Sequence, residues 1–123
     1  MSQRGAMIIS WDEGRPGVSA TKALGVFAGA LAFYDGLAKE GRISGYHVYA
    51  STSREHGELV IEGELSELAK ISIEPDALNQ LALGSAVVQN LRTELCVGGN
   101  ADDVSQYYAT TVQVVQEAGL DPE

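Results

Sequence analysis

The sequence predicts an α+β fold with the order β-α-β-β-α-β and one additional helix at the C-terminal end. Three observations predict it. Short runs of β-forming residues recur along the chain, longer segments carry apolar residues at helical spacing, and a polar connection separates two of the strand runs. The length of 123 residues suits a single domain, residues 1–123, with its own hydrophobic core.

The first strand is predicted at Ala6–Trp11, an apolar run rich in β-forming residues. The glycines and the proline of Asp12–Gly17 indicate a loop. A helix should follow over Ala20–Glu40, with Ser19 as its cap and Gly41 as its end. Its apolar residues form two adjacent stripes, so we expect it to be buried on two sides.

The stretch around Ile43–Glu64 predicts a hairpin with strands at Arg42–Ser53 and Gly57–Glu64, joined by a polar connection. Side chains alternate between the two faces of a strand. Burial of Leu59 and Ile61 with Val48 against the helices then leaves three residues for the second face: His47, Tyr49 and Glu62.

The remaining elements follow from the same signals. A helical turn with Ser66 as a candidate cap is predicted at Leu65–Ile71, and Pro75 suits the first turn of a longer helix. The predicted elements after that turn are a helix at Glu74–Asn90, a strand at Arg92–Val97 and a helix at Ala101–Ala118 capped by Asn100.

This order is the split βαβ pattern of the ferredoxin-like fold, with an antiparallel four-stranded sheet. The chain resembles the dimeric α/β-barrel group, which includes the small antibiotic-biosynthesis monooxygenases, and most of all its uncharacterised members. The likeness is one of layout over nearly the whole chain, carried by MIISW, LAKEGRISGYHVY, ELVIEGELSEL, the long helix and VSQYY. It implies a homodimer in which two sheets pack face to face as a barrel.

The physical argument agrees with a homodimer. A four-stranded sheet with helices on one face leaves its other face uncovered. Val60, Tyr49 and either Ile8 or Ile9 would be exposed in a monomer, and an apolar patch of that kind needs a partner.

Composition and charge argue against several classes of partner. The net charge is −9 and the eight basic residues are scattered, so we expect no nucleic acid and no membrane as a partner. Cys96 is the only cysteine and lies in an apolar run, which favours a small buried residue over a nucleophile. The N-terminal residues lack a signal-peptide pattern, and the longest uncharged apolar stretch, Ala23–Tyr34, is too short to span a bilayer. We therefore expect a cytoplasmic protein.

No standard nucleotide-binding or metal-binding motif is present in the sequence. The two histidines, His47 and His56, are far apart on a strand and in a connection, and His56 is interpreted as a solvated loop residue. The sequence therefore predicts no metal site and no tightly bound metal, flavin or haem cofactor.

The candidate catalytic residues are His47 and Glu62. If Val48 pairs with Ile61, His47 lies opposite Glu62, and a histidine held by a carboxylate can act as a general base. A cross-strand ion pair that only satisfies two polar groups is the alternative. Candidate ligand-binding residues around this pair are Trp11, Tyr34 and Tyr49, although Trp11 could equally cap the core.

Two functions follow as expectations. The first is a homodimer that binds a small organic ligand without established catalysis. The second, which the resemblance suggests, is a cofactor-independent monooxygenase or isomerase acting on a small aromatic or polyketide-like substrate. Fold analogy alone is a weak reason for choosing the second.

Overall fold

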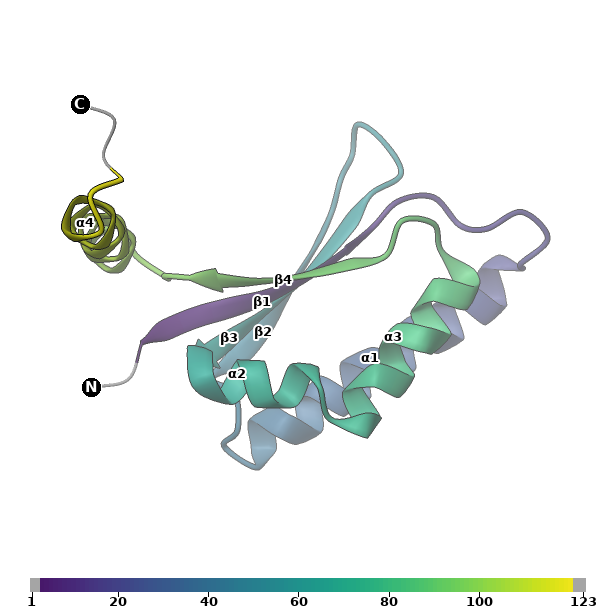
Figure 1. Ribbon diagram of the computed structural model, residues 1–123. Helices are drawn as coiled ribbons and strands as arrows, with labels where there is room; N and C mark the ends of the chain where they lie inside the picture. The colour runs from purple at the N-terminus through teal and green to yellow at the C-terminus, as the bar shows by residue number, and fades with distance from the viewer. Residues whose placement is uncertain (1–2, 121–123) are drawn as a thin grey trace.

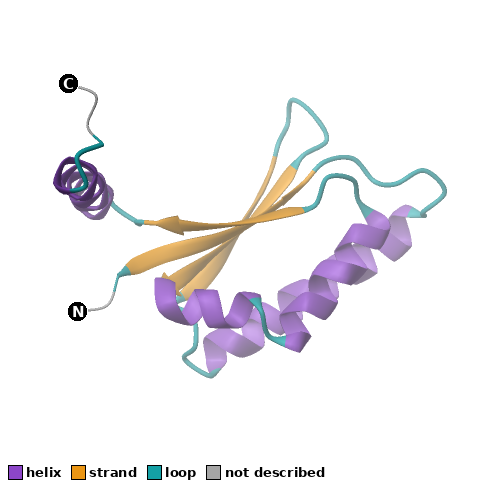
Figure 2. Cartoon of the chain, viewed as in Figure 1, coloured by secondary structure: helices purple, strands orange, loops and turns teal. Residues whose placement is uncertain are grey.

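The computed structural model describes residues 3–120, which form four strands and four helices (Figures 1 and 2). In chain order they are β1 (Arg4–Trp11), α1 (Ala20–Lys39), β2 (Gly45–Ala50), β3 (Gly57–Glu64), α2 (Leu65–Ser72), α3 (Pro75–Val87), β4 (Arg92–Val97) and α4 (Ala101–Glu117). The strands form one antiparallel sheet in the order β2-β3-β1-β4. This confirms the predicted ferredoxin-like fold.

The helices α1, α2 and α3 lie on one face of the sheet, and the sheet of the chain is open rather than closed into a barrel (Figure 2). We call the uncovered side the open face. The core lies between the sheet and these helices, and its most deeply buried side chains are Tyr34, Met7, Ile61, Leu68 and Ile71.

Alternation along the strands decides which residues enter this core. In β3, Leu59 and Ile61 are buried against the helices, while Val60 lies on the open face, as the sequence predicted. The sequence left open whether Ile8 or Ile9 of β1 lies on the uncovered face of the sheet. In the structure Ile9 is buried toward the helices, and Ile8 lies half-buried on the open face.

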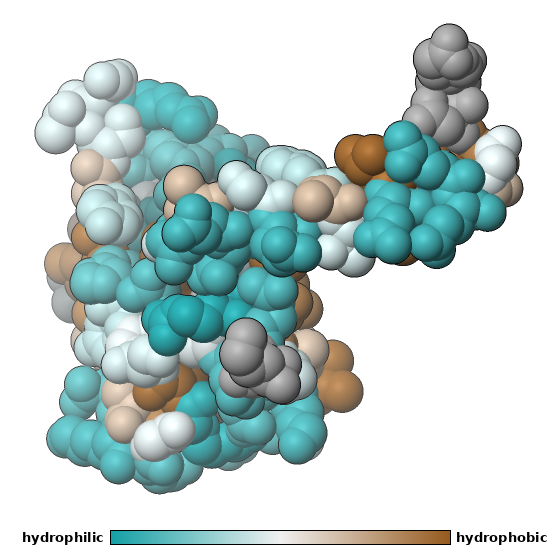
Figure 3. Space-filling model, turned by 90° about the vertical axis from the view of Figure 1, so that its left-hand side faces the viewer, coloured by the Kyte–Doolittle hydropathy of each residue, from teal (hydrophilic) through white to brown (hydrophobic). Residues whose placement is uncertain are grey.

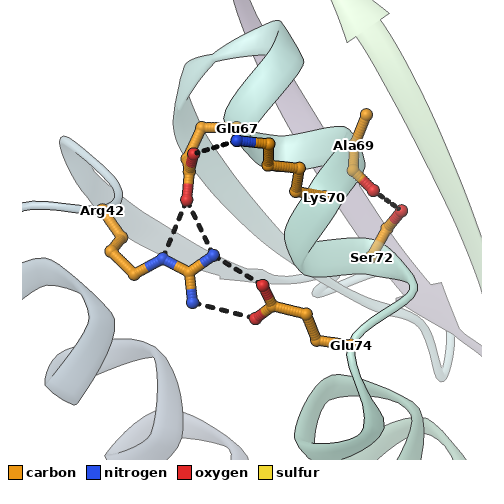
Figure 4. Close-up of polar contacts among 6 residues, drawn as sticks. All are labelled: Arg42, Glu67, Ala69, Lys70, Ser72 and Glu74. Carbon is orange, nitrogen blue, oxygen red and sulfur yellow. Dashed lines mark hydrogen bonds and ion pairs between the residues drawn. The ribbon is translucent and has the colours of Figure 1, made fainter.

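The second strand is shorter than predicted, since β2 covers Gly45–Ala50 rather than Arg42–Ser53. Arg42 instead belongs to the turn after α1, and its guanidinium binds two carboxylates (Figure 4). It donates from Nη1 and Nη2 to Glu74 at 2.8 and 2.7 Å and from Nε to Glu67 at 2.8 Å. This cluster joins the end of α1 to α2 and to the start of α3, which is why the chain is not a strand here.

The next two helices also differ at their ends from the prediction. Glu64, not Ser66, is the N-cap residue of α2, because the helix begins directly after β3. The helix predicted to reach Asn90 ends at Val87, since Val88 is extended and bridges to Gly14. Asn90 has a φ of 57°, which is incompatible with a continuing helix.

The prediction that the first helix is buried on two sides is wrong. Only Tyr34 and Leu37 of α1 are buried, and Leu24 in its first half is 66% exposed. Figure 1 gives the reason: α1 and α3 run side by side, yet diverge from the sheet toward the first residues of α1. The divergence opens a wedge between the helices and the sheet.

The last helix, α4, stands apart from the rest of the chain (Figure 1). It follows β4 and has no buried residue. Cys96 of β4 is half-buried on the open face rather than fully buried. Within residues 3–120, none of the helices combines the length and the apolar character that crossing a membrane requires.

Candidate functional site

His47 and Glu62 do meet, but not through the pairing assumed from the sequence. His47 lies opposite Val60, because Val48 pairs with Leu59 and not with Ile61. The contact is diagonal, with His47 Nε2 3.1 Å from Glu62 Oε1. The His47 side chain is 59% exposed, so the pair lies on the surface of the open face rather than in a pocket.

The residues predicted around His47 are divided between the two faces of the sheet. Tyr49 shares the open face with His47 and is 61% exposed. Trp11 and Tyr34 lie on the helix side, because Trp11 pairs with Gly57 in the buried row of β3 and Tyr34 projects from α1 into the core. The three predicted ligand-binding residues, Trp11, Tyr34 and Tyr49, nevertheless line one cavity, whereas His47 and Glu62 do not line it, so the structure brings together three of the five residues.

The helix side contains a cavity, the wedge between the sheet, α1 and α3, with a volume of about 930 Å³. Its walls are mostly apolar, which suits a ligand site of ordinary size. Val48 of β2 is 40% exposed toward this wedge because the helices have diverged from it. The apolar side chains lining the wedge include Ile9, Phe27, Ala30, Leu59, Leu81 and Leu91.

Trp11 forms one wall of the wedge. Its ring packs directly on Gly57, where a Cβ atom would lie 2.5 Å from Trp11 Cζ2. Its other neighbour is Phe27 of α1, edge to face, with ring centroids 5.8 Å apart. The single tryptophan of the chain thus joins the sheet to α1 at the place where the two begin to separate.

Tyr34 and Gln80 are polar side chains contributed to the lining by the helices α1 and α3. Tyr34 lines the wedge while being only 1% exposed, and burial raises the pKa of its hydroxyl to about 12, so it stays protonated at neutral pH. Gln80 of α3 also lines the wedge, and its Oε1 atom is buried without a hydrogen-bond partner among the described residues. Such an acceptor is satisfied when a donor binds beside it.

A polar cluster lies at the rim of the wedge, where β1 ends and β3 begins. His56 Nδ1 is 2.9 Å from Asp12 Oδ1, and its Nε2 is 3.3 Å from Glu58 Oε2. The His56 side chain is only 11% exposed. The sequence interpretation of His56 as a solvated loop residue is therefore wrong, and His56 with Asp12 replaces His47 with Glu62 as the histidine–carboxylate pair beside a cavity.

The other oxygen of Asp12 is also occupied. Asn90 Nδ2 donates to Asp12 Oδ2 at 2.9 Å, and the Arg92 guanidinium lies 3.7 Å from the same oxygen. The hydrogen bonds from His56 and then Asn90, with the charge of Arg92, hold the pKa of Asp12 below its ordinary value of 3.8. Asp12 therefore stays ionised at neutral pH and fixes the ring orientation of His56.

The chemistry open to His56 depends on its second nitrogen. When Nδ1 donates to Asp12 and Glu58 turns away, Nε2 is left as a hydrogen-bond acceptor and can take a proton from a bound molecule. Glu58 can move because its side chain is 42% exposed. A ring that carries both protons donates to both carboxylates and only fastens the hairpin to β1.

Sequence reasoning missed Asp12, His56 and Gln80. The predicted fold did contain a signal for Asp12 and His56, because its first and third strands are antiparallel neighbours. Once Ile9 is set opposite Leu59, the residues after Trp11 and before Gly57 fall opposite each other as the next pair. Gln80 carried no such signal, because its surroundings depend on how α3 packs on α1.

A metal centre finds no support in the part of the chain that the structure describes, residues 3–120, where no group of three His, Cys, Asp or Glu side chains is arranged to hold a metal ion. The acidic groups at the rim of the wedge are already engaged by His56, Asn90 and Arg92.

Comparison with known proteins finds relatives by structure only. No protein-family model and no curated protein matches this chain. Similar solved structures include a dimeric ferredoxin-like protein of unknown function from Thermobifida fusca, 14% identical, which covers 78% of this chain and 92% of its own with a TM-score of 0.59. A dimeric protein of unknown function and ferredoxin-like fold from Bacteroides fragilis is 12% identical, with 76% and 96% covered and a TM-score of 0.57.

A third similar structure is a conserved protein of unknown function from Bacteroides thetaiotaomicron, described as a possible oxidoreductase. It is 11% identical, covers 79% of this chain and 98% of its own, and has a TM-score of 0.57. At these identities the likeness is one of fold. Each of the three is covered almost completely, whereas about a fifth of this chain has no counterpart in them.

Proposed function

We propose that this protein is a homodimer that binds a small, mostly apolar organic molecule with a hydroxyl group, in the wedge between the sheet and the helices α1 and α3. The carrying observation is an apolar cavity of about 930 Å³ with the unpartnered Oε1 of Gln80 in its wall. Ligand pockets typically have roughly 300–1,000 Å³, apolar walls and a few polar groups that fix orientation.

The polar groups select the ligand class. Gln80 lines the cavity, and its Oε1 is buried without a hydrogen-bond partner among the described residues, so a ligand with a hydroxyl or N–H donor can satisfy this atom once the Gln80 side chain turns toward the cavity. The apolar walls contributed by Trp11, Phe27 and Val48 favour a flat or aromatic body. A phenol or a polyketide-like enol combines both features.

The dimer part of the proposal rests on the open face. Ile8 and Val60 lie side by side at its centre, with Ala6 and Cys96 beside them, and no part of the described chain covers them. Two such faces related by a two-fold axis cover each other. The neighbours from Thermobifida fusca and Bacteroides fragilis are described as dimeric, which supports the same assembly here.

A matched pair of probes tests the pocket: 4-butylphenol and butylbenzene, which differ only in the hydroxyl donor. Binding is followed through the emission of Trp11, the single tryptophan, and by isothermal titration calorimetry. We expect the phenol to bind about fivefold more tightly, since one hydrogen bond is worth about 1 kcal/mol. Gln80→Leu should remove the difference, and Gln113→Leu on the exposed face of α4 should keep it.

A second variant tests whether the probes bind inside the wedge. Ala30 lines the wedge, and Ala30→Phe should fill part of the cavity and weaken both probes together without removing the helix. Absence of saturable binding by either probe, or binding unaffected by Ala30→Phe, would show that the wedge is not a ligand site.

A specific observation favours catalysis as a second candidate function. The His56–Asp12 pair at the rim supplies a general base for an acidic carbon or a phenol, as an isomerase or a cofactor-independent monooxygenase requires. The Bacteroides thetaiotaomicron neighbour, described as a possible oxidoreductase, gives this candidate limited support. Proton exchange at an acidic carbon of a bound ketone, measured by NMR, should then be lost in His56→Gln and reduced in Asp12→Asn; equal exchange in all three proteins would reject it.

A further inference from the structure

The helix α4 has an amphipathic surface that its own chain leaves uncovered. With 3.6 residues per turn, its large apolar side chains gather on one side and its acidic and amide side chains on the other. The apolar side, here called the α4 stripe, consists of Val104, Tyr107, Tyr108, Thr111, Val112, Val114 and Val115. Tyr108 is 63% exposed and Val112 53%.

The N-terminal turn of α4 is held by contacts with the preceding residues, although the rest of the helix buries no side chain. Asn100 caps the helix by accepting a hydrogen bond from the N–H of Asp103 at 2.9 Å. Val104 packs on Gly98, where a Cβ atom would lie 2.7 Å from Val104 Cγ2. The helix therefore leaves β4 in a set direction, away from α1, α2 and α3 (Figures 1 and 3).

A helix of this kind is not stable by itself. Isolated helices shorter than about 12–15 residues are marginal in water, and longer ones in proteins depend mainly on packing of an apolar face. The 17 residues of α4 bury no side chain in their own chain. Something outside the chain must therefore cover the α4 stripe.

Charge argues against a lipid surface as that partner. Helices that lie on membranes usually carry lysine and arginine on their polar side. The charged residues of α4 are Asp102, Asp103 and Glu117, and the helix has no basic residue. An anionic membrane would repel it, as it would repel a chain with a net charge of −9.

The area of the interface argues for a second copy. The four strands, about 4.8 Å apart and about 20–26 Å long, give the open face roughly 400–500 Å². A specific interface of standard size buries about 800 Å² on each partner. The α4 helix, about 26 Å long and about 10 Å wide, adds roughly 260 Å² and supplies most of the difference.

We infer that α4 is an arm that packs its apolar stripe on a second copy of this chain, beside the two open faces that meet in the dimer. The inference rests on the proposed homodimer and goes beyond it by assigning α4 a role in the interface. Two-fold symmetry places two arms in each dimer, so each subunit both gives and receives one.

Two variants of the full chain with equal changes in charge test the arm. The first, Tyr108→Lys with Val112→Lys, alters the α4 stripe; the second, Gln106→Lys with Gln113→Lys, alters the opposite side of the same helix. Sedimentation equilibrium gives the dimer dissociation constant of each. We expect the stripe variant to raise the dimer dissociation constant at least about tenfold, because it removes buried aromatic contacts. The second variant should change the dissociation constant less than about threefold.

Additional measurements separate the other outcomes. Because α4 buries no residue in its own chain, the stripe variant should melt like the wild type when both are monomeric, which excludes simple misfolding. If both variants have the same dimer dissociation constant as the wild type, the proposed packing of α4 on the second copy is rejected, and the proposed homodimer is kept. A wild type that is monomeric at micromolar concentration would reject both, and flotation of that monomer with phosphatidylcholine–phosphatidylglycerol vesicles would assign the stripe to lipid.

Discussion

At the scale of single residues, charged side chains hold the chain where regular elements end. Arg42 joins the end of α1 to Glu67 and Glu74, and Asp12 joins the end of β1 to His56 and Asn90. Each cluster stands at a turn, where the backbone has few partners of its own. The contacts of Asp12 explain how an irregular loop keeps the rim of the wedge in one geometry.

The Arg42 cluster gives a pH-dependent prediction. The hydrogen bond from Arg42 holds the pKa of Glu74 below its ordinary value of 4.5. The stabilisation by ionised Glu74 is therefore fully present above that value and is lost as the pH falls through the lowered pKa. Glu74→Gln should lower the free energy of unfolding at pH 7, and its difference from the wild type should shrink as the pH falls from 4.5 through the lowered pKa.

Urea unfolding at pH 7, 5 and 3, run on both proteins, measures this difference. Glu13→Gln, a change at an exposed loop residue, is the control. A difference between Glu74→Gln and the wild type that does not depend on pH would show that the carboxylate charge of Glu74 plays no part.

The contact between Trp11 and Gly57 gives the second prediction. A Cβ atom at position 57 would lie 2.5 Å from the indole ring, whereas one at Gly63, in the same buried row of β3, would meet its nearest atom at 3.5 Å. Gly57→Ala should therefore destabilise the fold by about 1–3 kcal/mol, the usual effect of overpacking. Gly63→Ala should cost less than half as much in the same thermal melts, and equal losses would contradict the role of Trp11.

At the scale of the elements, α1 combines a buried half and an exposed half. Tyr34 and Leu37 near its end lie in the core, while Leu24 near its start is exposed beside the wedge. A Cβ atom at Gly25 or Gly29 meets nothing within 4 Å, so neither glycine is a close packing contact within the described chain.

The free space around Gly29 predicts a stabilising substitution. Gly29→Ala adds a methyl group in free space and improves helix propensity by about 1 kcal/mol. Gly41→Ala is the matched opposite, because Gly41 ends α1 with a φ of 77° that strains a side chain. Thermal unfolding should show a gain for the first and a loss for the second, and a loss for Gly29→Ala would indicate an unseen partner on that side of α1.

At the scale of the whole molecule, the open face has an apolar centre and a charged border. Glu58, Glu62, Glu64 and Glu94 lie on it with the basic residues Arg4 and Arg92, so acidic residues outnumber basic ones and two such faces bring like charges together. Each subunit also carries a net charge of −9. The proposed dimer therefore forms against an electrostatic cost that salt reduces.

The corresponding prediction concerns ionic strength. Raising sodium chloride from about 50 mM to about 500 mM shortens the Debye length from about 14 Å to about 4 Å, which screens the repulsion between the faces. The dimer dissociation constant should fall several-fold over this range, as measured by sedimentation equilibrium. A constant that rises with salt would mean that opposite charges pair across the interface.

The sequence by itself determined the order of the elements, and alternation assigned the faces of the hairpin. Leu59 and Ile61 are buried as expected, and His47 does contact Glu62. The expected burial of Val48 is wrong, because the helices diverge from β2 and leave Val48 40% exposed. The assumed pairing was nevertheless shifted by two residues. A shift of two keeps every side chain on its own face, so a pattern with period two fixes the face and leaves the partner undetermined.

Tertiary structure alone decided which residues share a site. Trp11, Tyr34 and Tyr49 line the cavity, whereas His47 lies on the open face outside it. His56 meets Asp12 across 44 positions of sequence, and the wedge exists because α1 and α3 diverge from the sheet. Local patterns record which side of an element is apolar; the angle at which two elements pack depends on all the side chains between them, and no single stretch of sequence contains that information.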